Sequence, residues 1–150
     1  MLTRKMYLLL TACFLASVFM TAGCGGEEGS RRVVEYPKHS LADVIRSLEN
    51  AGFEIGRRMT EEEGFAEMME DDREGSGAEE VDQFEVNGRD IAVYVFDLSR
   101  EDARQNMQRT IEGRTDPEVE ERPLQHDNLL VFDISAHPQA DAIREAILGM

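Results

Sequence analysis

The chain has 150 residues, about one domain's length, and its 41% hydrophobic and 31% charged residues are typical of a soluble chain with a packed core. The 31 acidic residues outnumber the 16 basic ones and give a formal charge of -15. This charge excludes a nucleic-acid binder, because phosphate recognition needs clustered Lys and Arg. Two Cys and three His leave little material for a disulfide framework or a Cys/His zinc site.

The first 23 residues have the pattern of an export signal. Arg4 and Lys5 provide a positive start, and residues 6–20 form a run of 15 residues without a charge. A helix of that length is about 22 Å long, whereas the hydrocarbon core of a bilayer is about 30 Å thick. The run therefore predicts a cleaved signal peptide rather than a membrane span.

Thr21-Ala22-Gly23-Cys24 follows this run and resembles the lipobox of bacterial lipoprotein precursors, with Thr21 where Leu is usual. The resemblance covers residues 1–24. It implies a signal peptide at 1–23, a covalent lipid such as palmitate on Cys24, and no particular activity. Leu10-Thr11-Ala12-Cys13 fits the box letter by letter, but the apolar run before it is too short for a signal. An ordinary cleaved signal and an uncleaved anchor are the alternatives.

The residue after the proposed lipid site bears on location. Gly25 is similar to the residue found there in outer-membrane lipoproteins, because the residue that retains this class at the inner membrane is usually Asp. The resemblance therefore implies the cell envelope: the outer membrane if the envelope is double, and otherwise the outer face of the cell membrane.

Residues 24–32 are predicted to form a flexible tether, and residues 33–150 a single domain. Residues 33–36 favour a strand that Pro37 stops. Ser40, with Asp43 three residues later, predicts the N-terminus of a helix. The apolar stripe of this helix is Leu41, Val44, Ile45 and Leu48.

The next segments predict a strand, a helix and a loop. Residues 53–59 alternate between apolar and polar positions, which favours a strand. Thr60 and Glu63 form a capping-box pattern for a second helix. Residues 71–80, with the sequence DDREGSGAEE, read as a loop.

The C-terminal half begins with Asn87-Gly88, the strongest hairpin signal in the chain. Residues 91–98 are nearly all apolar and predict a strand in the middle of a sheet. Ser99 is predicted to cap the following helix. Residues 129–134 predict another strand, and residues 140–147 carry the apolar stripe of a last helix.

Val95-Phe96-Asp97-Leu98-Ser99 returns 36 residues later as Val131-Phe132-Asp133-Ile134-Ser135. This repeat predicts two βα units whose strands are parallel and joined by a right-handed crossover. The expected fold is α+β: a two-layer sandwich of a mixed β-sheet with about three helices on one face and an internal βα repeat.

Two sets of residues are weak candidates for chemistry. Asp97 and Asp133 follow equivalent strands, and paired carboxylates can perform acid/base chemistry or bind a metal. The acidic stretch 72–80 partly imitates a calcium loop, with oxygen ligands available from Asp72, Glu74, Ser76 and Glu80. In both cases a purely structural role is the competing interpretation.

The three histidines are scattered at the ends of predicted elements. His39 is expected just before a helix cap, His126 in a turn, and His137 close to the start of the last helix. None has a His or Cys partner at metal-ligand spacing, so structural roles are expected for all three. No confident metal site follows from the sequence.

The sequence therefore predicts a lipid-anchored envelope protein that is not an enzyme, carries no cofactor besides its covalent lipid, and serves as a binding or assembly accessory. Its expected partners are the membrane and an envelope protein or ligand of unknown identity. The alternative is a weakly calcium-responsive module that uses residues 72–80. Cysteine chemistry is excluded if Cys13 leaves with the signal and Cys24 carries the lipid.

A first prediction concerns salt. Cleavage before Cys24 removes two basic residues and no acidic ones, so the mature charge is -17. Repulsion among the carboxylates destabilises the compact state, and salt screens it. The melting temperature measured by calorimetry is therefore expected to rise from low salt to about 1 M NaCl, where the Debye length is about 3 Å. A flat or falling curve would contradict this expectation.

Overall fold

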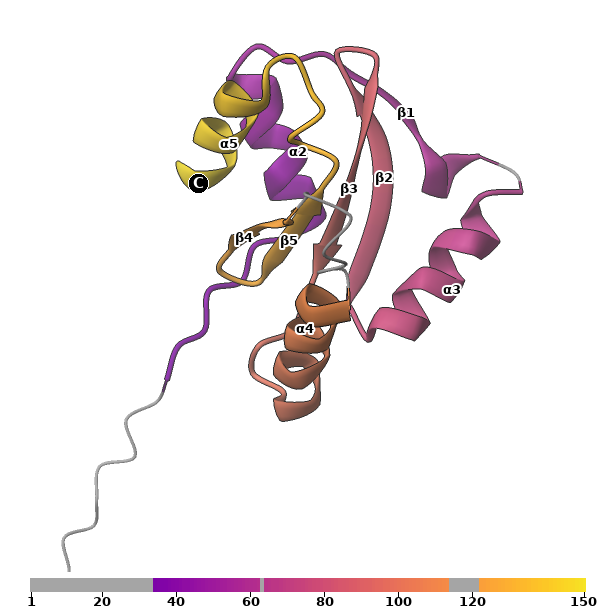
Figure 1. Ribbon diagram of the computed structural model, residues 1–150, viewed down its shortest axis with the longest axis vertical. Helices are drawn as coiled ribbons and strands as arrows, with labels where there is room; N and C mark the ends of the chain where they lie inside the picture. The colour runs from indigo at the N-terminus through magenta and orange to yellow at the C-terminus, as the bar shows by residue number, and fades with distance from the viewer. Residues whose placement is uncertain (1–33, 63, 114–121) are drawn as a thin grey trace, which may run out of the picture. The chain divides into compact units, whose positions relative to one another are not determined.

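Five strands pair into one sheet in the order β1-β2-β3-β5-β4, and every neighbouring pair is antiparallel (Figure 1). The computed structural model describes residues 34–62, 64–113 and 122–150. The strands are Ile55–Arg58 (β1), Glu80–Val86 (β2), Arg89–Val95 (β3), Leu124–His126 (β4) and Leu129–Phe132 (β5). The helices are Leu41–Asn50 (α2), Ala66–Ser76 (α3), Glu101–Gly113 (α4) and Ala140–Leu148 (α5), with a 3-10 turn at Met59–Glu61 (η1). The predicted α+β class is confirmed.

The helices cover both faces of the sheet rather than one. Successive side chains of a strand point to opposite faces, so each strand contributes to two cores. On one face, α2 and α5 pack against the sheet through Val44, Leu48, Ile143, Ile147, Phe84, Val93 and Val131. On the other face, α3 and α4 pack through Met69, Met107, Tyr94, Phe96, Leu130 and Phe132. The expectation of a single helical layer is wrong because β3 and β5 are apolar on both sides.

The predicted central strand is present, but it ends at Val95 rather than at Leu98. β3 lies between β2 and β5, and its last three residues, Val93, Tyr94 and Val95, are all buried. The predicted hairpin that leads into it is also present. Val86 pairs with Arg89, so Asn87 and Gly88 form a two-residue turn. Both have positive φ, 50° and 77°, the conformation that Asn-Gly accommodates most readily in a hairpin.

The first predicted helix is confirmed together with its cap. The Ser40 hydroxyl accepts a hydrogen bond from the Asp43 backbone, and the Asp43 carboxylate accepts one from the Ser40 backbone N–H. The Ser40 side chain, followed by its backbone, holds the pKa of Asp43 below its ordinary value. Leu41, Val44 and Leu48 are buried as the stripe predicted.

The segment between β1 and β2 differs from the prediction. Residues 66–76 form α3, so the helix begins later than the Thr60 pattern predicted and extends into the expected loop. The backbone N–H of Thr60 instead donates to the carboxylate of Asp82, which is fully buried and also pairs with Arg58 at 2.8 Å. This buried acceptor holds residues 59–61 in the 3-10 turn. The predicted cap partner Glu63 lies outside the described residues.

The N-terminal strand predicted at 33–36 is not formed at residues 34–36, and residue 33 lies outside the described part. The parallel crossover is also wrong. β4 and β5 form a hairpin in which His126 pairs with Leu129, and this turn reverses the chain before β5 reaches β3. Val95 consequently pairs with Leu129 in an antiparallel ladder, so the sheet is not mixed. β3 and β5 are each followed by a helix, but α4 and α5 pack on opposite faces, so the repeat does not form two equivalent βα units.

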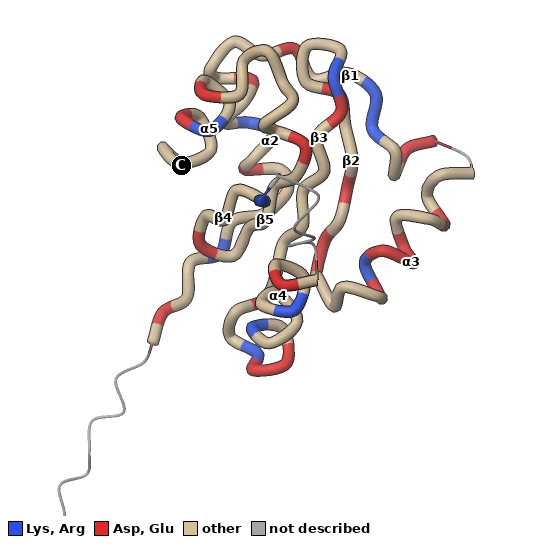
Figure 2. Tube along the Cα trace, viewed as in Figure 1, with Lys and Arg blue, Asp and Glu red and all other residues tan. Residues whose placement is uncertain are grey.

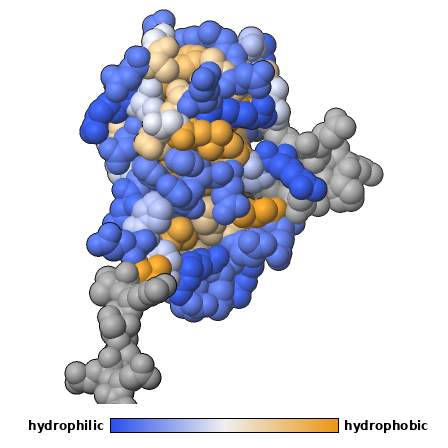
Figure 3. All heavy atoms as spheres, turned by 90° about the vertical axis from the view of Figure 1, so that its left-hand side faces the viewer, coloured by the Kyte–Doolittle hydropathy of each residue, from blue (hydrophilic) through white to orange (hydrophobic). Residues whose placement is uncertain are grey.

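Acidic residues occur on all four described α-helices and along β2 (Figure 2). The side that lies on the left in Figure 1 is mainly hydrophilic, with small apolar areas between the polar residues (Figure 3). Among the described residues, no helix combines the length and hydrophobicity that a membrane crossing requires.

A second prediction concerns the core between β5 and the helices α3 and α4. Phe132 is 4% exposed and meets Tyr94 edge-on with ring centroids 5.3 Å apart. Replacing Phe132 by Ala is expected to lower the free energy of unfolding by about 3–5 kcal/mol, measured by chemical denaturation. Leu148, which is 51% exposed, provides the control, because its replacement by Ala leaves no buried cavity. Equal effects of the two substitutions would contradict the packing described.

Candidate functional site

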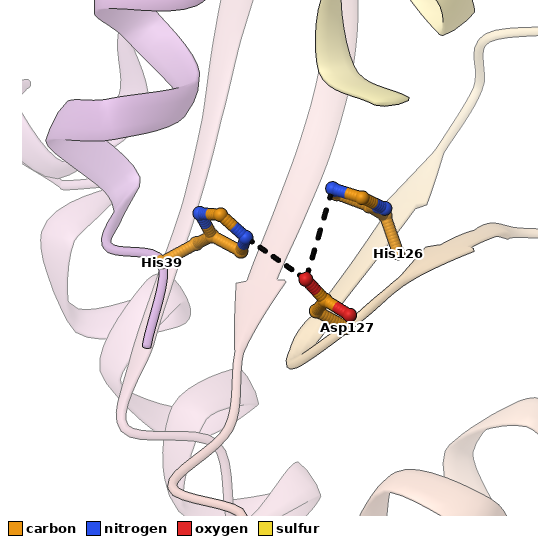
Figure 4. Close-up of side chains that lie close together, drawn as sticks. All are labelled: His39, His126 and Asp127. Carbon is orange, nitrogen blue, oxygen red and sulfur yellow. Dashed lines mark hydrogen bonds and ion pairs between the residues drawn. The ribbon is translucent and has the colours of Figure 1, made fainter. Parts of the chain in front are cut away.

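Three side chains of the kinds that can bind a metal meet where α2 begins and where the β4–β5 hairpin turns (Figure 4). His39 immediately precedes the cap residue of α2. His126 is the last residue of β4, and Asp127 is the first residue of the turn. The ligand atoms of all three lie within 4.8 Å of one another.

The Asp127 carboxylate lies between the two imidazoles. Its Oδ2 is 3.1 Å from Nε2 of His39 and 3.9 Å from Nε2 of His126. The two rings stack with centroids 5.3 Å apart and planes inclined by 25°. The His side chains are 20% and 18% exposed, whereas that of Asp127 is 39% exposed, so the cluster is open to solvent on the carboxylate side.

Asn128 fixes the two segments that carry these ligands. Its side-chain oxygen accepts from the backbone N–H of His39, and its amide nitrogen donates to the backbone carbonyl of His39, both at 2.9 Å. The same amide nitrogen lies 3.2 Å from the carbonyl oxygen of Phe96. Asn128 is 2% exposed, so these bonds are shielded from water and hold the start of α2 against the hairpin.

One ring atom of the cluster has an unmet bonding requirement. Nε2 of His126 is buried and has no hydrogen-bond partner among the described residues. The 3.9 Å separation from Asp127 is too long for a hydrogen bond. A buried polar atom without a partner destabilises a fold by about 1–3 kcal/mol, which makes this nitrogen a natural ligand atom for something bound at the site.

Asp97 and Asp133 do not come together. Because β3 and β5 are antiparallel, the two residues follow opposite ends of the paired strands. Their positions along the ladder differ by about six residues, or about 20 Å at 3.3 Å per residue. Such a separation prevents the pair from acting on one substrate or ion.

Each Asp has its own local surroundings. The Ser99 hydroxyl and then the Ser99 backbone N–H hold the pKa of Asp97 below its ordinary value. Asp133 adopts a positive φ of 63°.

The calcium-loop candidates lie in regular structure instead of a loop. Asp72, Glu74 and Ser76 belong to α3, and Glu80 begins β2. At 100° per residue, Glu74 projects from the opposite side of the helix to Asp72 and Ser76. The oxygens therefore do not converge as they do around the ion of a calcium loop.

The remaining predicted positions are placed as follows. Cys24 lies outside the described residues. His137 is buried, with Nε2 2.9 Å from the Val86 carbonyl oxygen and Nδ1 accepting from the Gln139 backbone, so both ring nitrogens have partners. Its role is structural, as expected. His39 and His126, which no metal-ligand spacing connects along the sequence, lie in one cluster in the structure.

Comparison with known proteins adds nothing to this picture, since no protein-family model, curated protein or solved structure matches the chain.

The His39–His126–Asp127 cluster is not evident from the sequence. His39 is separated from Asp127 by 88 positions, so no spacing rule connects them. The one indication in the sequence is the His-Asp-Asn run at 126–128, just before an apolar strand. Asp and Asn favour tight turns, and a turn at the end of a strand places its polar side chains at the edge of the sheet.

A third prediction tests how the two segments are held. Replacing Asn128 by Ala removes three side-chain hydrogen bonds to the backbone of His39 and Phe96. The free energy of unfolding, measured in guanidinium chloride, is expected to fall by about 2–4 kcal/mol, because buried backbone groups lose their partners. The exposed Asn50 supplies the control, for which Ala is expected to change stability by less than about 0.5 kcal/mol. A neutral Asn128 variant would contradict the role assigned here.

Proposed function

We propose that this protein is a lipid-anchored domain of a bacterial cell envelope that works as a binding or assembly accessory rather than as an enzyme. One observation carries the proposal: a positive start, 15 uncharged residues and a lipobox-like run ending at Cys24 stand in the order that lipoprotein processing requires. One lipid chain gives marginal membrane binding and two give stable residence. The modification expected on Cys24 therefore accounts for the location.

The length of the predicted tether supports a position close to the membrane. A flexible chain of about six residues has an average reach of about 15 Å. The folded unit begins at Glu35, shortly after the predicted tether ends at residue 32. The domain would therefore meet ligands at the membrane surface.

Binding is favoured over catalysis because the catalytic pair that the sequence offered is separated. Asp97 and Asp133 follow opposite ends of adjacent antiparallel strands, too far apart to share a reacting group. The calcium-responsive alternative is not supported, because most of the expected loop belongs to α3. The identity of a ligand then depends on the side chains that do converge.

A fourth prediction tests the anchor, and the chain provides its own control. Cells expressing the wild type are expected to retain the protein in a membrane fraction that detergent, but not 1 M salt, releases. Cys24→Ala is expected to leave an unprocessed precursor or a soluble domain. Cys13→Ala is expected to behave as the wild type, because Cys13 lies inside the signal.

Mass spectrometry of the mature N-terminal peptide gives the direct readout. An acylated Cys24 at the N-terminus supports the proposal. A soluble wild-type protein with an unmodified Cys24 would contradict it.

A further inference from the structure

We propose that His39, His126 and Asp127 form a binding site for a first-row transition-metal dication, with Zn²⁺ as the representative ion. Two imidazole nitrogens and one carboxylate oxygen would bind the metal, and water or an external ligand would complete a four-coordinate shell. The site goes beyond the proposed envelope function and does not depend on the lipid anchor, because the three ligands belong to the folded unit Glu35–Met150.

The distances are close to those of a metal shell. Ligand atoms around a tetrahedral Zn²⁺ with bonds of about 2.0–2.1 Å are about 3.3 Å apart. His39 Nε2 and Asp127 Oδ2 already lie 3.1 Å apart, and the whole set lies within 4.8 Å. The two rings are stacked with planes inclined by 25°, so one imidazole must rotate about its side-chain bonds for both lone pairs to point at one ion. The Asp127 side chain, 39% exposed, has room to follow that rotation.

The donor set selects the class of ion. Imidazole nitrogen suits Zn²⁺, Cu²⁺, Ni²⁺ and Fe²⁺, whereas Ca²⁺ and Mg²⁺ require oxygen ligands. Coordination would also give Nε2 of His126 the partner it lacks among the described residues, and so remove the cost of a buried, unbonded ring nitrogen. The carboxylate would offset part of the ion's charge within a strongly acidic chain that attracts cations.

The scaffold holds the ligands before a metal arrives. The buried Asn128 side chain fixes the backbone of His39 against the turn that carries Asp127. His126 pairs with Leu129 in the β4–β5 ladder, which fixes its backbone as well. Because the backbones are already fixed, metal binding requires only the three side chains to move. Such pre-organisation lowers the entropic cost of binding.

Binding would join the start of the folded unit to the hairpin at the edge of the sheet. His39 stands at the N-terminus of α2, and β4 is an edge strand. An ion held by both would add a cross-link between segments 87 residues apart in sequence. Because the three ligands converge only in the folded chain, the ion would bind that state more tightly than the unfolded one, and zinc would stabilise the fold.

The first test is a calorimetric titration of the full chain in detergent micelles with ZnCl₂, in the presence of millimolar CaCl₂. Calcium occupies carboxylate-only sites on the acidic surface and leaves imidazole sites free. We expect one zinc ion per chain, and a melting temperature raised by about 10 °C at a hundredfold excess over the dissociation constant. Failure to bind zinc under these conditions would overturn the proposal.

Matched variants separate this site from nonspecific binding. Asp127→Asn and His126→Ala are each expected to weaken zinc binding about tenfold or more, since even indirect partners of a metal site contribute that much. Asp141→Asn removes the same charge from an exposed position outside the cluster and is expected to leave binding unchanged. Equal weakening by Asp127→Asn and Asp141→Asn would show that charge alone attracts the ion, and would overturn the proposal.

Imidazole nitrogen NMR on the wild type covers the case in which a variant fails to fold. The chain has three histidines, and His137 serves as an internal control because both of its ring nitrogens already have hydrogen-bond partners. Zinc is expected to shift the Nε2 resonances of His39 and His126 and to leave those of His137 in place. Shifts absent from His39 and His126, or equal in all three histidines, would contradict the site.

Discussion

The buried amide of Asn128 ties together parts of the chain that are far apart in sequence. It bonds both backbone polar groups of His39 and the carbonyl of Phe96, so that the start of α2, the end of β3 and the β4–β5 turn share one small polar contact. Few other polar side chains are buried among the described residues, Asp82 and His137 being two of them. Together with the buried apolar stripe of α2, this contact holds the start of α2 against the hairpin and brings His39 beside Asp127.

The sheet around this contact is buried on both faces, which gives the site a rigid support. β3 lies at its centre, with α2 and α5 on one face and α3 and α4 on the other. The metal-ligating side chains stand at one end of this sheet, beside its edge strand β4. The cluster therefore combines fixed backbones with an exposed carboxylate, an arrangement that suits exchangeable binding better than a sealed structural metal centre.

Local signals predicted the elements that depend on local chemistry. The Ser40–Asp43 cap and the Asn87-Gly88 turn each satisfy their own backbone, so their sequences were sufficient. The signals failed where distant partners decide. The Thr60 backbone N–H bonds to Asp82, so Thr60 does not cap a helix. β4 has only three residues and shows no periodic pattern, yet its hairpin with β5 reverses the chain and makes β5 antiparallel to β3. The candidate site was missed for the same reason, because its ligands meet only after the sheet and α2 are in place.

The proposed metal cluster lies close to where the chain enters the folded unit. His39 lies 15 positions after Cys24, so an anchored protein would present the ion near the membrane. The most direct measurement is a crystal structure of the chain grown with Zn²⁺, with anomalous diffraction recorded on both sides of the zinc absorption edge. The account predicts one strong anomalous peak about 2.0–2.2 Å from Nε2 of His39, Nε2 of His126 and a carboxylate oxygen of Asp127. Zinc found only on surface carboxylates, with the His39–Asp127 hydrogen bond intact, would contradict it.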